Sequence, residues 1–372
     1  MTHHARVSIV VALLFSAGLS LKAQVAENDT ALANKVDDYL KSELSSKRIP
    51  GMSVCVVRDG KVIFAKGYGF ANIELSATAT QETIYEVASL TKPFTATAIM
   101  MLVEEGKISL EDSLSKYFPD APETWRKIKI RHLLSHTSGL SDFFSIPALR
   151  SESGFAWERE YKPEELLRVL FQASLQTQPG EKWSYSNIGY YLLGFLIEKV
   201  TGDTYEQFLR RRIFQPLKMT ATQRMSRKDV IQNRASGYTW DHNVLRNAAP
   251  TSATWAYSEG GLVSSVSDLA KADAGLFAAK LLKRTTLEQM WSPTRLNDGT
   301  IARYGFGWNI GSDPARRQIY HSGNKPGFFS IIRHYVDDHL TVVLLANADS
   351  GIDVGAISYH LATFYLPPAG VR

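Results

Sequence analysis

The alternation of apolar and polar residues divides the chain into strand-forming ends and a helical middle. Met52–Val57 and Val62–Ala65 have strand patterns, and the Asp59-Gly60 pair between them suits a two-residue type I′ turn. From Ser89 to about Ile231 the period is mostly helical, with Gly or Pro at the breaks. Strand patterns return after Tyr304, around Phe306–Ile310, Gln318–His321, Phe329–Tyr335 and Leu340–Ala346, with a turn at Asp337-Asp338.

Helical patterns flank these strands at both ends of the chain, near Ala31–Ser46 and Val354–Tyr365. Strands at both ends of a helical middle predict one antiparallel sheet assembled from the two ends, with helices covering its faces. The predicted fold class is therefore α+β. We place the sheet part at about residues 24–88 and 250–372 and the mostly α-helical insertion at about 89–249, with a cleft where the two meet.

The first 23 residues have the pattern of a secretory signal peptide. Val7–Leu21 is mostly apolar and follows Arg6, and Ala23 offers a small residue for cleavage. The apolar stretch is short for a spanning helix, which needs about 20 residues. We therefore expect a secreted or periplasmic protein with no stable membrane insertion; the alternative is an uncleaved anchor.

Composition excludes several classes of protein. The 372 residues are 44% apolar and 21% charged, which excludes bulk disorder, and the single cysteine, Cys55, has no partner for an internal disulfide. Loss of residues 1–23 removes two basic residues, so the net charge falls from +5 to +3. With so small a charge and no basic stripe, we expect no nucleic-acid partner. The run Arg210–Arg212 is interpreted as complementing the C-terminal end of a helix.

The candidate chemistry begins at Ser89-Leu-Thr-Lys92, at the start of an apolar helix predicted from Ser89 to Glu105. Residues three apart share a helical face, so the Ser89 hydroxyl and the Lys92 amine would point into the same space. A desolvated neutral lysine can take the proton of a serine. The spacing alone is weak, because Ser113–Lys116 and Ser322–Lys325 share it. The alternative is a helix-capping serine beside a surface lysine.

The second element is Tyr185-Ser-Asn187, in a polar loop before an apolar helix that starts near Ile188. A tyrosine beside a lysine cation can act as a general base and then as an acid. Asn187 can hydrogen-bond both a lysine and a substrate amide. The alternative is that Asn187 caps the helix and Tyr185 is a buried ring.

The third element is His321-Ser322-Gly323, at the end of a candidate strand. Small residues there let a substrate backbone approach the strand edge. The amide of Asn324 could pair with that of Ser89 as an oxyanion hole. The alternative is a strand that ends in a turn with a structural histidine.

In this order and combination, the three elements resemble those of the serine β-lactamase and penicillin-binding-protein superfamily, nearest to its class C branch. That branch includes class C β-lactamases, D-alanyl-D-alanine carboxypeptidases, D-aminopeptidases and family VIII esterases. The resemblance extends from about Asp37 to Ala346. It also covers the stretches Leu133–Leu140, Ile213–Met219, Gly260–Leu269 and Tyr304–Trp308. His136 belongs to the first of these stretches and is interpreted as structural.

The resemblance implies a role for each element. Ser89 would be the acylated nucleophile, Lys92 and Tyr185 would share the proton transfers, and Asn187 would orient Lys92 and the substrate. The residues that would line the substrate site are His321, Ser322, Gly323 and Asn324. The resemblance implies no metal or organic cofactor, and the partner would be a small ester, amide or D-amino-acid peptide.

The chain departs from true β-lactamases at the third element, where these usually carry Lys-Thr-Gly and a cation that holds the carboxylate of a β-lactam. His321 has an ordinary pKa of about 6.5 and is expected to be neutral near pH 7. Lys325 could partly replace the cation, or it could face solvent beyond the turn. The arrangement of class A is further away, because that class carries Ser-Asp-Asn where this chain has Tyr-Ser-Asn. Lys162–Leu167 faintly resembles the glutamate loop of class A but lacks its asparagine, and it is interpreted as a helix start with Pro163 in the first turn. Deacylation is therefore expected to use Tyr185 rather than a glutamate.

Five aromatic residues are candidates for an apolar acyl pocket. Trp183 is placed in the cleft because it lies in the loop of Tyr185. The other four could line the pocket or pack in the core; they are Tyr238, Trp240, Trp255 and Tyr257.

The predicted function is hydrolysis of esters or amides through an acyl-serine intermediate. The alternatives are a D-amino-acid-specific peptidase or D-Ala-D-Ala carboxypeptidase, and a weak class C-like β-lactamase. A non-hydrolytic penicillin-binding or structural relative is the alternative from another class.

Overall fold

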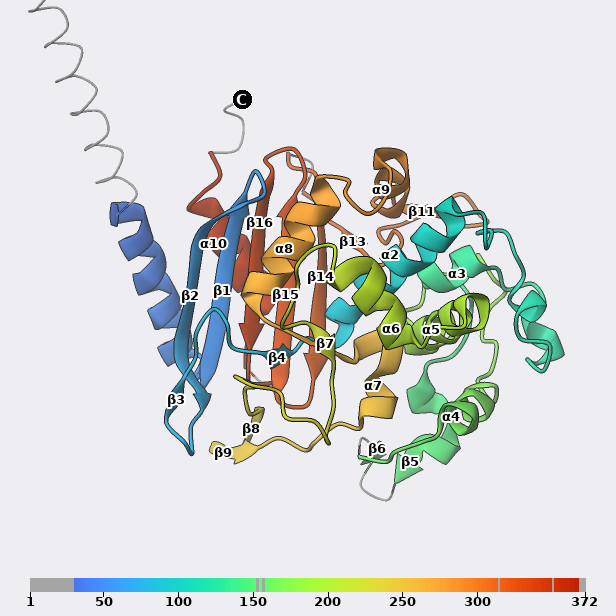
Figure 1. Cartoon of the computed structure of the whole chain (residues 1–372), viewed down its shortest axis with the longest axis horizontal. Helices are drawn as coiled ribbons and strands as arrows, with labels where there is room; N and C mark the ends of the chain where they lie inside the picture. Colours follow the sequence, from blue (N-terminus) through green and yellow to red (C-terminus); the bar gives the residue numbers. More distant parts are fainter. Residues whose placement is uncertain (1–29, 152–153, 156–157, 314, 350, 368–372) are drawn as a thin grey trace, which may run out of the picture.

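The computed structural model describes residues 30–151, 154–155, 158–313, 315–349 and 351–367, so the predicted signal peptide lies outside the described residues. A large antiparallel sheet stands beside a helical part formed by the middle of the chain (Figure 1). The sheet has seven strands in the order β13-β14-β15-β16-β1-β2-β3. These strands are β1 (Gly51–Arg58), β2 (Lys61–Asn72), β3 (Ala77–Thr78), β13 (Asn309–Ile310), β14 (Gln318–Lys325), β15 (Phe328–Tyr335) and β16 (Leu340–Ala346). The predicted α+β class is confirmed.

The two ends of the chain meet in the middle of this sheet. β1 pairs with β16 from Met52 opposite Ala346 to Arg58 opposite Leu340. On its other side β1 forms the predicted hairpin with β2, and Asp59 and Gly60 have the positive φ angles, 50° and 71°, that a type I′ turn requires. All residues of β16 are buried, because both faces of the sheet are covered. This burial explains why β16 is a continuous apolar run rather than an alternating one.

Helices cover both faces of the sheet. The helix of residues 30–46 and α10 (Val354–Thr363) cover one face, where Val36 and Leu361 share a core cluster with Leu344 of β16. Helix α8 (Val266–Phe277) packs on β1 and β16 at the other face. Both terminal helical patterns expected from the sequence are confirmed, and so is the turn between β15 and β16, at residues 336–339.

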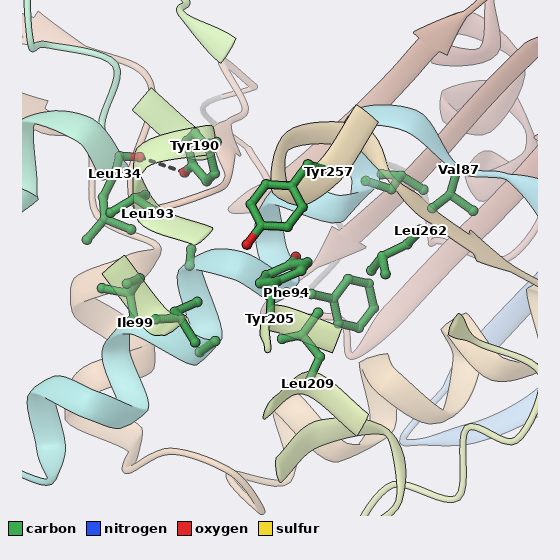
Figure 2. Close-up of a cluster of buried hydrophobic side chains, with 14 of the residues drawn as sticks. Val87, Phe94, Ile99, Leu134, Tyr190, Leu193, Tyr205, Leu209, Tyr257 and Leu262 are labelled. Carbon is green, nitrogen blue, oxygen red and sulfur yellow. Dashed lines mark hydrogen bonds between the residues drawn. The ribbon is translucent and has the colours of Figure 1, made fainter. Parts of the chain in front are cut away.

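The helical part is built around α2 and α5, which pack on each other and on α7. Its longer helices are α2 (Thr91–Glu104), α4 (Pro163–Leu170), α5 (Asn187–Thr201) and α7 (Ala253–Gly260). The remaining helical segments are η1 (Ala88–Leu90), η2 (Leu114–Lys116), η3 (Glu123–Trp125), α3 (Ile130–Leu134), η4 (Phe143–Ser145), η5 (Pro147–Leu149), α6 (Tyr205–Leu209), the π-helical η6 (Arg210–Phe214) and α9 (Arg284–Met290). Figure 2 shows part of their shared core, where the Tyr190 hydroxyl donates to the carbonyl of Leu134 at 2.8 Å.

Four small sheets complete the described fold. One of them has the order β4-β10-β7 and the other three are two-stranded. Their strands are β4 (Tyr85–Glu86), β7 (Gln223–Arg224), β10 (Leu262–Ser264), β5 (Arg150–Ser151), β6 (Gly154–Phe155), β8 (Tyr238–Asp241), β9 (Val244–Asn247), β11 (Thr294–Arg295) and β12 (Ile301–Ala302). Within the described ranges, no helix combines the length and apolar character needed to cross a bilayer.

Two predicted elements differ from the structure. The helix expected from Ser89 to Glu105 is divided, because Ser89 lies in the short turn η1 and α2 begins only at Thr91. The strand expected at Phe306–Ile310 is reduced to Asn309–Ile310. Gly307 has a φ of 79°, and the amide of Gly305 donates to the carbonyl of Trp308, so this segment forms a turn before the strand begins.

Candidate active site

Ser89 lies where the helical part meets the sheet, in the turn between β4 and α2. The preceding residue, Ala88, has a φ of 48°, a left-handed conformation that costs a non-glycine residue about 1 kcal/mol. The Ser330 hydroxyl of β15 donates to the carbonyl of Val87 at 2.7 Å and so ties this turn to the sheet. Backbone strain of this kind is concentrated at functional sites, where the surrounding structure holds it in place.

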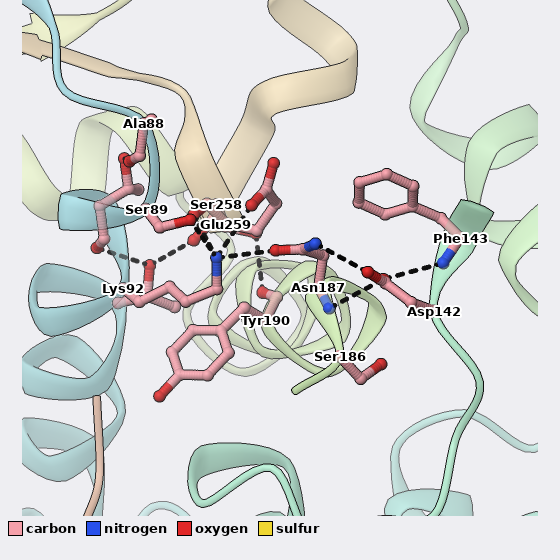
Figure 3. Close-up of polar contacts among 12 residues, drawn as sticks. Ala88, Ser89, Lys92, Asp142, Phe143, Ser186, Asn187, Tyr190, Ser258 and Glu259 are labelled. Carbon is pink, nitrogen blue, oxygen red and sulfur yellow. Dashed lines mark hydrogen bonds and ion pairs between the residues drawn. The ribbon is translucent and has the colours of Figure 1, made fainter. Parts of the chain in front are cut away.

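The side chain of Lys92 is fully buried and lies at the centre of a polar network (Figure 3). Its Nζ donates to the hydroxyl of Ser89 at 3.0 Å and to Oδ1 of Asn187 at 2.8 Å. It also contacts Glu259 twice, at 2.8 Å to the backbone carbonyl and 2.9 Å to the carboxylate oxygen Oε2. The expected contact between Ser89 and Lys92 is therefore present. The alternative of a surface lysine is wrong.

The charge of Lys92 differs from the expectation. Burial lowers the pKa of Lys92, but the charge of Glu259 and the contact with Tyr185 raise it, and the net pKa is above the ordinary value. The sequence considerations above involve a neutral, desolvated lysine, and no sequence motif points to Glu259. In the resting site Lys92 is instead an ammonium group paired with a carboxylate.

Tyr185 lies beside this network and is partly buried. Its ring centroid is 4.9 Å from Nζ of Lys92. Burial raises the pKa of Tyr185, and the Lys92 cation and hydrogen bonds with Lys92 and Ser89 offset this only in part. The ring of His136 packs against Tyr185, and Nδ1 of His136 accepts from the amide of Ser186 at 3.2 Å. His136 therefore supports the tyrosine from behind.

Asn187 is the first residue of α5 and joins Lys92 to Asp142, an acidic residue that no sequence motif indicates. Its Nδ2 donates to Oδ2 of Asp142 at 3.0 Å, and its backbone amide donates to Oδ1 at 3.0 Å (Figure 3). The amide of Phe143 donates to the same Oδ1 at 2.8 Å. Burial raises the pKa of Asp142, and these amide donors offset it only in part. The one indication in the sequence is that Asp142 lies two residues after Leu133–Leu140, a stretch that the family resemblance covers.

The third element lies on β14, which runs alongside the turn of Ser89. A Cβ added to Gly323 would lie 2.3 Å from the carbonyl oxygen of Val87 and 3.0 Å from the amide nitrogen of Ser89. Because such contacts are too short, only glycine allows this approach of β14 to Ser89. Ser322 and Asn324, on either side of Gly323, line the cavity.

His321 is buried and electrically neutral. Its Nδ1 lies 2.8 Å from the carbonyl oxygen of Ser322, which can only accept, so Nδ1 carries the proton and Nε2 accepts from the hydroxyl of Tyr304 at 3.0 Å. Burial and the nearby charge of Lys92 lower the pKa of His321 to about 3. The expectation of a neutral histidine at this point is confirmed.

Lys325 does not face solvent, contrary to one of the two interpretations above. It is only 6% exposed, and its Nζ lies 2.6 Å from Oε2 of Glu86. The other oxygen of Glu86 accepts from Arg234 at 2.6 Å. The charge of Lys325 is therefore compensated, although its side chain lines the cavity.

A cavity of about 500 Å³ opens beside Ser89. Its described lining includes aromatic side chains, of which Phe144 and Trp183 are 44% and 41% exposed at the rim. The placement of Trp183 in the cleft is confirmed. Among the four uncertain aromatic residues, Trp255 lines the cavity and Tyr257 packs in the core of Figure 2. Tyr238 and Trp240 of β8 instead bond to Glu74 and to the carbonyl of Arg48.

The other two Ser-x-x-Lys matches have different surroundings. Ser113 accepts from the amide of Ser115 at the start of η2, and Lys116 pairs with Asp112. Ser322 and Lys325 lie on β14, and Lys325 forms an ion pair with Glu86. Among the described residues, no group of three or more His, Cys, Asp or Glu side chains could hold a metal ion.

Comparisons with known proteins agree with this geometry. A profile of the family described as Beta-lactamase matches residues 32–363. Penicillin-binding protein 4* of Bacillus subtilis (strain 168) is 32% identical over 312 residues, which cover 80% of this chain and 68% of that protein. The matched region covers 63% of the length of the other curated relatives, so the chain spans about two thirds of the length of the curated relatives it matches.

Two solved structures are similar over most of the chain. The octameric penicillin-binding protein homologue from Pyrococcus abyssi has a TM-score of 0.78 at 30% identity, covering 89% of this chain and 77% of that chain. The D-amino acid amidase from Ochrobactrum anthropi SV3 has a TM-score of 0.75 at 25% identity, covering 90% and 99%. The fold and these similarities together place the chain among the serine hydrolases that act through an acyl-enzyme intermediate. The chain belongs to the Beta-lactamase family.

Proposed function

We propose that this protein hydrolyses uncharged esters or amides through an acyl intermediate on Ser89. The observation that carries the proposal is the hydrogen bond between Lys92 and the Ser89 hydroxyl at the wall of the cavity, with Tyr185 and Asn187 in the same network. A serine needs a neighbouring group that takes its proton before it can attack a carbonyl. The other two Ser-x-x-Lys matches lack such surroundings.

In the proposed mechanism, Oγ of Ser89 attacks the substrate carbonyl while its proton passes into the hydrogen-bond network around Lys92, which includes Tyr185 and Glu259. The amides of Ser89 and Asn324 stabilise the oxyanion, because β14 runs close to the turn of Ser89. Tyr185 then delivers a proton to the leaving group. A water molecule attacks the acyl-serine in the second half of the reaction, and the same groups act in reverse.

The charges around the cavity favour an uncharged substrate. His321 is neutral, and the charge of Lys325 is compensated by Glu86. A substrate carboxylate therefore meets no uncompensated cation among the described lining residues. The rings of Phe144, Trp183 and Trp255 instead offer apolar contact to an acyl group. Ester or amide hydrolysis is thus favoured over hydrolysis of a β-lactam.

Hydrolysis of a D-amino-acid amide is the second candidate. The similarity to a D-amino acid amidase over 90% of the chain supports this second candidate function. The carboxyl group of Asp142 also lines the cavity and would accept a hydrogen bond from the ammonium group of such a substrate. The apolar stretch within residues 1–23 supports a location outside the cytoplasm, which N-terminal sequencing of the mature protein would test.

The test is pre-steady-state release of p-nitrophenol from p-nitrophenyl butyrate by the wild type and by Ser89→Ala. We expect a burst followed by turnover in the wild type and neither in the variant. Equal activity in both would overturn the assignment of Ser89. Faster hydrolysis of nitrocefin than of the ester would overturn the preference for uncharged substrates, and a faster reaction with D- than with L-phenylalanine amide would favour the second candidate.

A further inference from the structure

Glu259 is held against Lys92 by the local backbone as well as by its charge. Helix α7 is interrupted at Tyr257, whose φ of 9° and ψ of −120° are not helical. The hydroxyl of Thr95 donates to the carbonyl of Ser258 at 2.7 Å, and the hydroxyl of Ser258 donates to the carbonyl of Tyr190 at 2.9 Å. These bonds fix the segment so that both the carbonyl and the carboxylate of Glu259 contact Lys92 (Figure 3).

The neighbouring helix is shaped to accept this segment. A Cβ added to Gly194 of α5 would lie 2.2 Å from Oγ of Ser258 and 2.8 Å from the ring of Tyr257. The absence of a side chain at Gly194 therefore lets α7 lie close against α5. The position of Glu259 thus depends on the packing of three helices and is not that of a surface residue resting on a lysine.

The protons in the network can be counted. Lys92 is an ammonium and Tyr185 is a phenol in the resting site, so each already carries the full number of protons. The carbonyl oxygens of Asn187 and Glu259 that contact Lys92 accept hydrogen bonds but are not bases. Before Lys92 can take the proton of Ser89, it must therefore pass one of its own protons to another group. The carboxylate of Glu259 can accept this proton and lies 2.9 Å from Nζ of Lys92.

We propose that Glu259 is a positioning residue that acts through Lys92 by accepting one of its protons. The Nζ–H bond of Lys92 breaks as an O–H bond forms on Oε2 of Glu259, and the lone pair left on Nζ takes the proton of Ser89. The freed electron pair of Oγ forms the bond to the substrate carbonyl carbon, and the π electrons of the C=O bond move to its oxygen. As this oxyanion collapses, the bond to the leaving group breaks, and Lys92 returns the serine proton to the leaving group through Tyr185. The proton held by Glu259 returns to Nζ once Lys92 has given up the serine proton. This inference rests on the proposed function of Ser89.

Other titratable groups face Glu259 from the surrounding elements. They are Lys92 on α2, Asp142 before η4, Tyr185 before α5, Tyr191 on α5 and Tyr205 on α6. Burial raises the pKa of each of these tyrosines, so they keep their protons near neutral pH. Asp142 is a second carboxylate, and it accepts hydrogen bonds from the amide groups of Phe143 and Asn187. The carboxylate of Glu259 is in contact with the ammonium group of Lys92.

The test is the pH dependence of the acylation burst in Glu259→Gln. Without the carboxylate, the pKa of Lys92 falls, because the charge of Glu259 no longer raises it, but Lys92 must now lose a proton to water before Ser89 can attack. Activity then follows the neutral fraction of Lys92 and should recover as the pH rises. We expect the burst rate at pH 7 to fall about 100-fold, in the usual range for general acid–base groups, and the acid limb of the profile to move to higher pH. A loss of the same factor at every pH, or no loss, would overturn the proposal.

Two further variants keep the test decisive. Glu259→Asp retains a proton acceptor, so we expect a lower burst rate but the same acid limb of the pH profile as in the wild type. An acid limb shifted to higher pH in this variant would contradict proton transfer to residue 259. This result would count even if Glu259→Gln were too unstable to assay. Glu86→Gln is the matched control, since it removes another buried glutamate paired with a lysine of the same cavity, and should not move the limb. Activity retained in Ser89→Ala would refute the proposed function. If Ser89→Ala is inactive but the acid limb of the pH profile does not move in Glu259→Gln, only the role of Glu259 is refuted.

Discussion

The imidazole ring of His136 packs against the phenol ring of Tyr185, with ring centroids 4.1 Å apart and planes inclined by 31°. His136 is buried and has a φ of 57°. Burial and the charge of Lys92 keep the pKa of His136 well below its ordinary value, so the ring is neutral. The contact therefore places Tyr185 by packing, without adding a charge to the site.

Replacement of His136 by leucine should impair the reaction more than the fold. Tyr185 would lose the ring behind it, and the amide of Ser186 would lose its acceptor, which costs about 1–3 kcal/mol. We expect the burst rate to fall about 10- to 100-fold, because misplacement of a reacting group costs up to about 100-fold. His132→Leu is the matched control, because Nδ1 of His132 also accepts a backbone amide, that of Lys129 at 3.1 Å. A similar loss of rate in both variants would show that the contact with Tyr185 has no special effect.

Asp142 should affect the reaction through Asn187. In Asp142→Ala the Asn187 side chain loses the acceptor that fixes its orientation, so its Oδ1 is no longer directed at Lys92. We expect kcat/KM for p-nitrophenyl butyrate to fall about 10- to 100-fold, since displacement of a positioning group costs up to about 100-fold. Asp142→Asn keeps one acceptor oxygen and should lose less. Equal activity of Asp142→Ala and the wild type would contradict this role.

Gly323→Ala should separate β14 from Ser89. The added Cβ would meet the carbonyl of Val87 at 2.3 Å, and backbone atoms cannot rotate away as a side chain does. We expect the acylation burst to disappear while circular dichroism still shows a folded protein. Gly355→Ala on α10 is the control, since its nearest atom is the movable carboxylate of Asp353. An active Gly323→Ala variant would mean that β14 need not approach Ser89 so closely.

His321 should make the protein less stable in acid. Its pKa of about 3 in the folded protein lies below the ordinary 6.5, so the unfolded chain binds a proton that the folded chain does not. Its contribution to stability is complete above pH 6.5 and is lost as the pH falls toward 3. In urea unfolding at pH 7 and pH 4.5, His321→Gln should lose less stability than the wild type. A decline of the same size in both proteins would refute the depressed pKa.

Cys55 should be unreactive in the folded protein. The side chain is fully buried in β1, and burial raises the pKa of its thiol to about 12. Since the thiolate is the reactive form, iodoacetamide should leave esterase activity unchanged and label Cys55 only after denaturation. Inactivation of the native enzyme with labelling of Cys55 would contradict this. Because the chain has a single cysteine, the experiment also separates serine from thiol chemistry.

Much of the sheet could be predicted because its signals are local. The range of β16 was predicted as the structure has it, and the Asp59-Gly60 turn has the conformation its residues favour. The division of the helix at Ser89 could not be seen, because the left-handed conformation of Ala88 is not encoded by a glycine. It is held by tertiary contacts such as the bond from Ser330.

The residues of the candidate site could be predicted as far as the three motifs extend. The structure brings the predicted Ser89, Lys92 and Asn187 together, but Glu259 and Asp142 come from segments whose proximity only tertiary packing creates. The charge of Glu259 raises the pKa of Lys92, and the sequence alone does not indicate that contact. Similarly, spacing along the chain could not separate Trp255, which lines the cavity, from the three aromatic residues that pack elsewhere.

The most direct test of the central claim is peptide mass mapping of the enzyme quenched in acid during turnover of p-nitrophenyl butyrate. The account predicts one butyryl group on the peptide that contains Ser89, accumulating with the burst of p-nitrophenol and absent from Ser89→Ala. A butyryl group on another residue, or a burst with no acylated peptide, would contradict it.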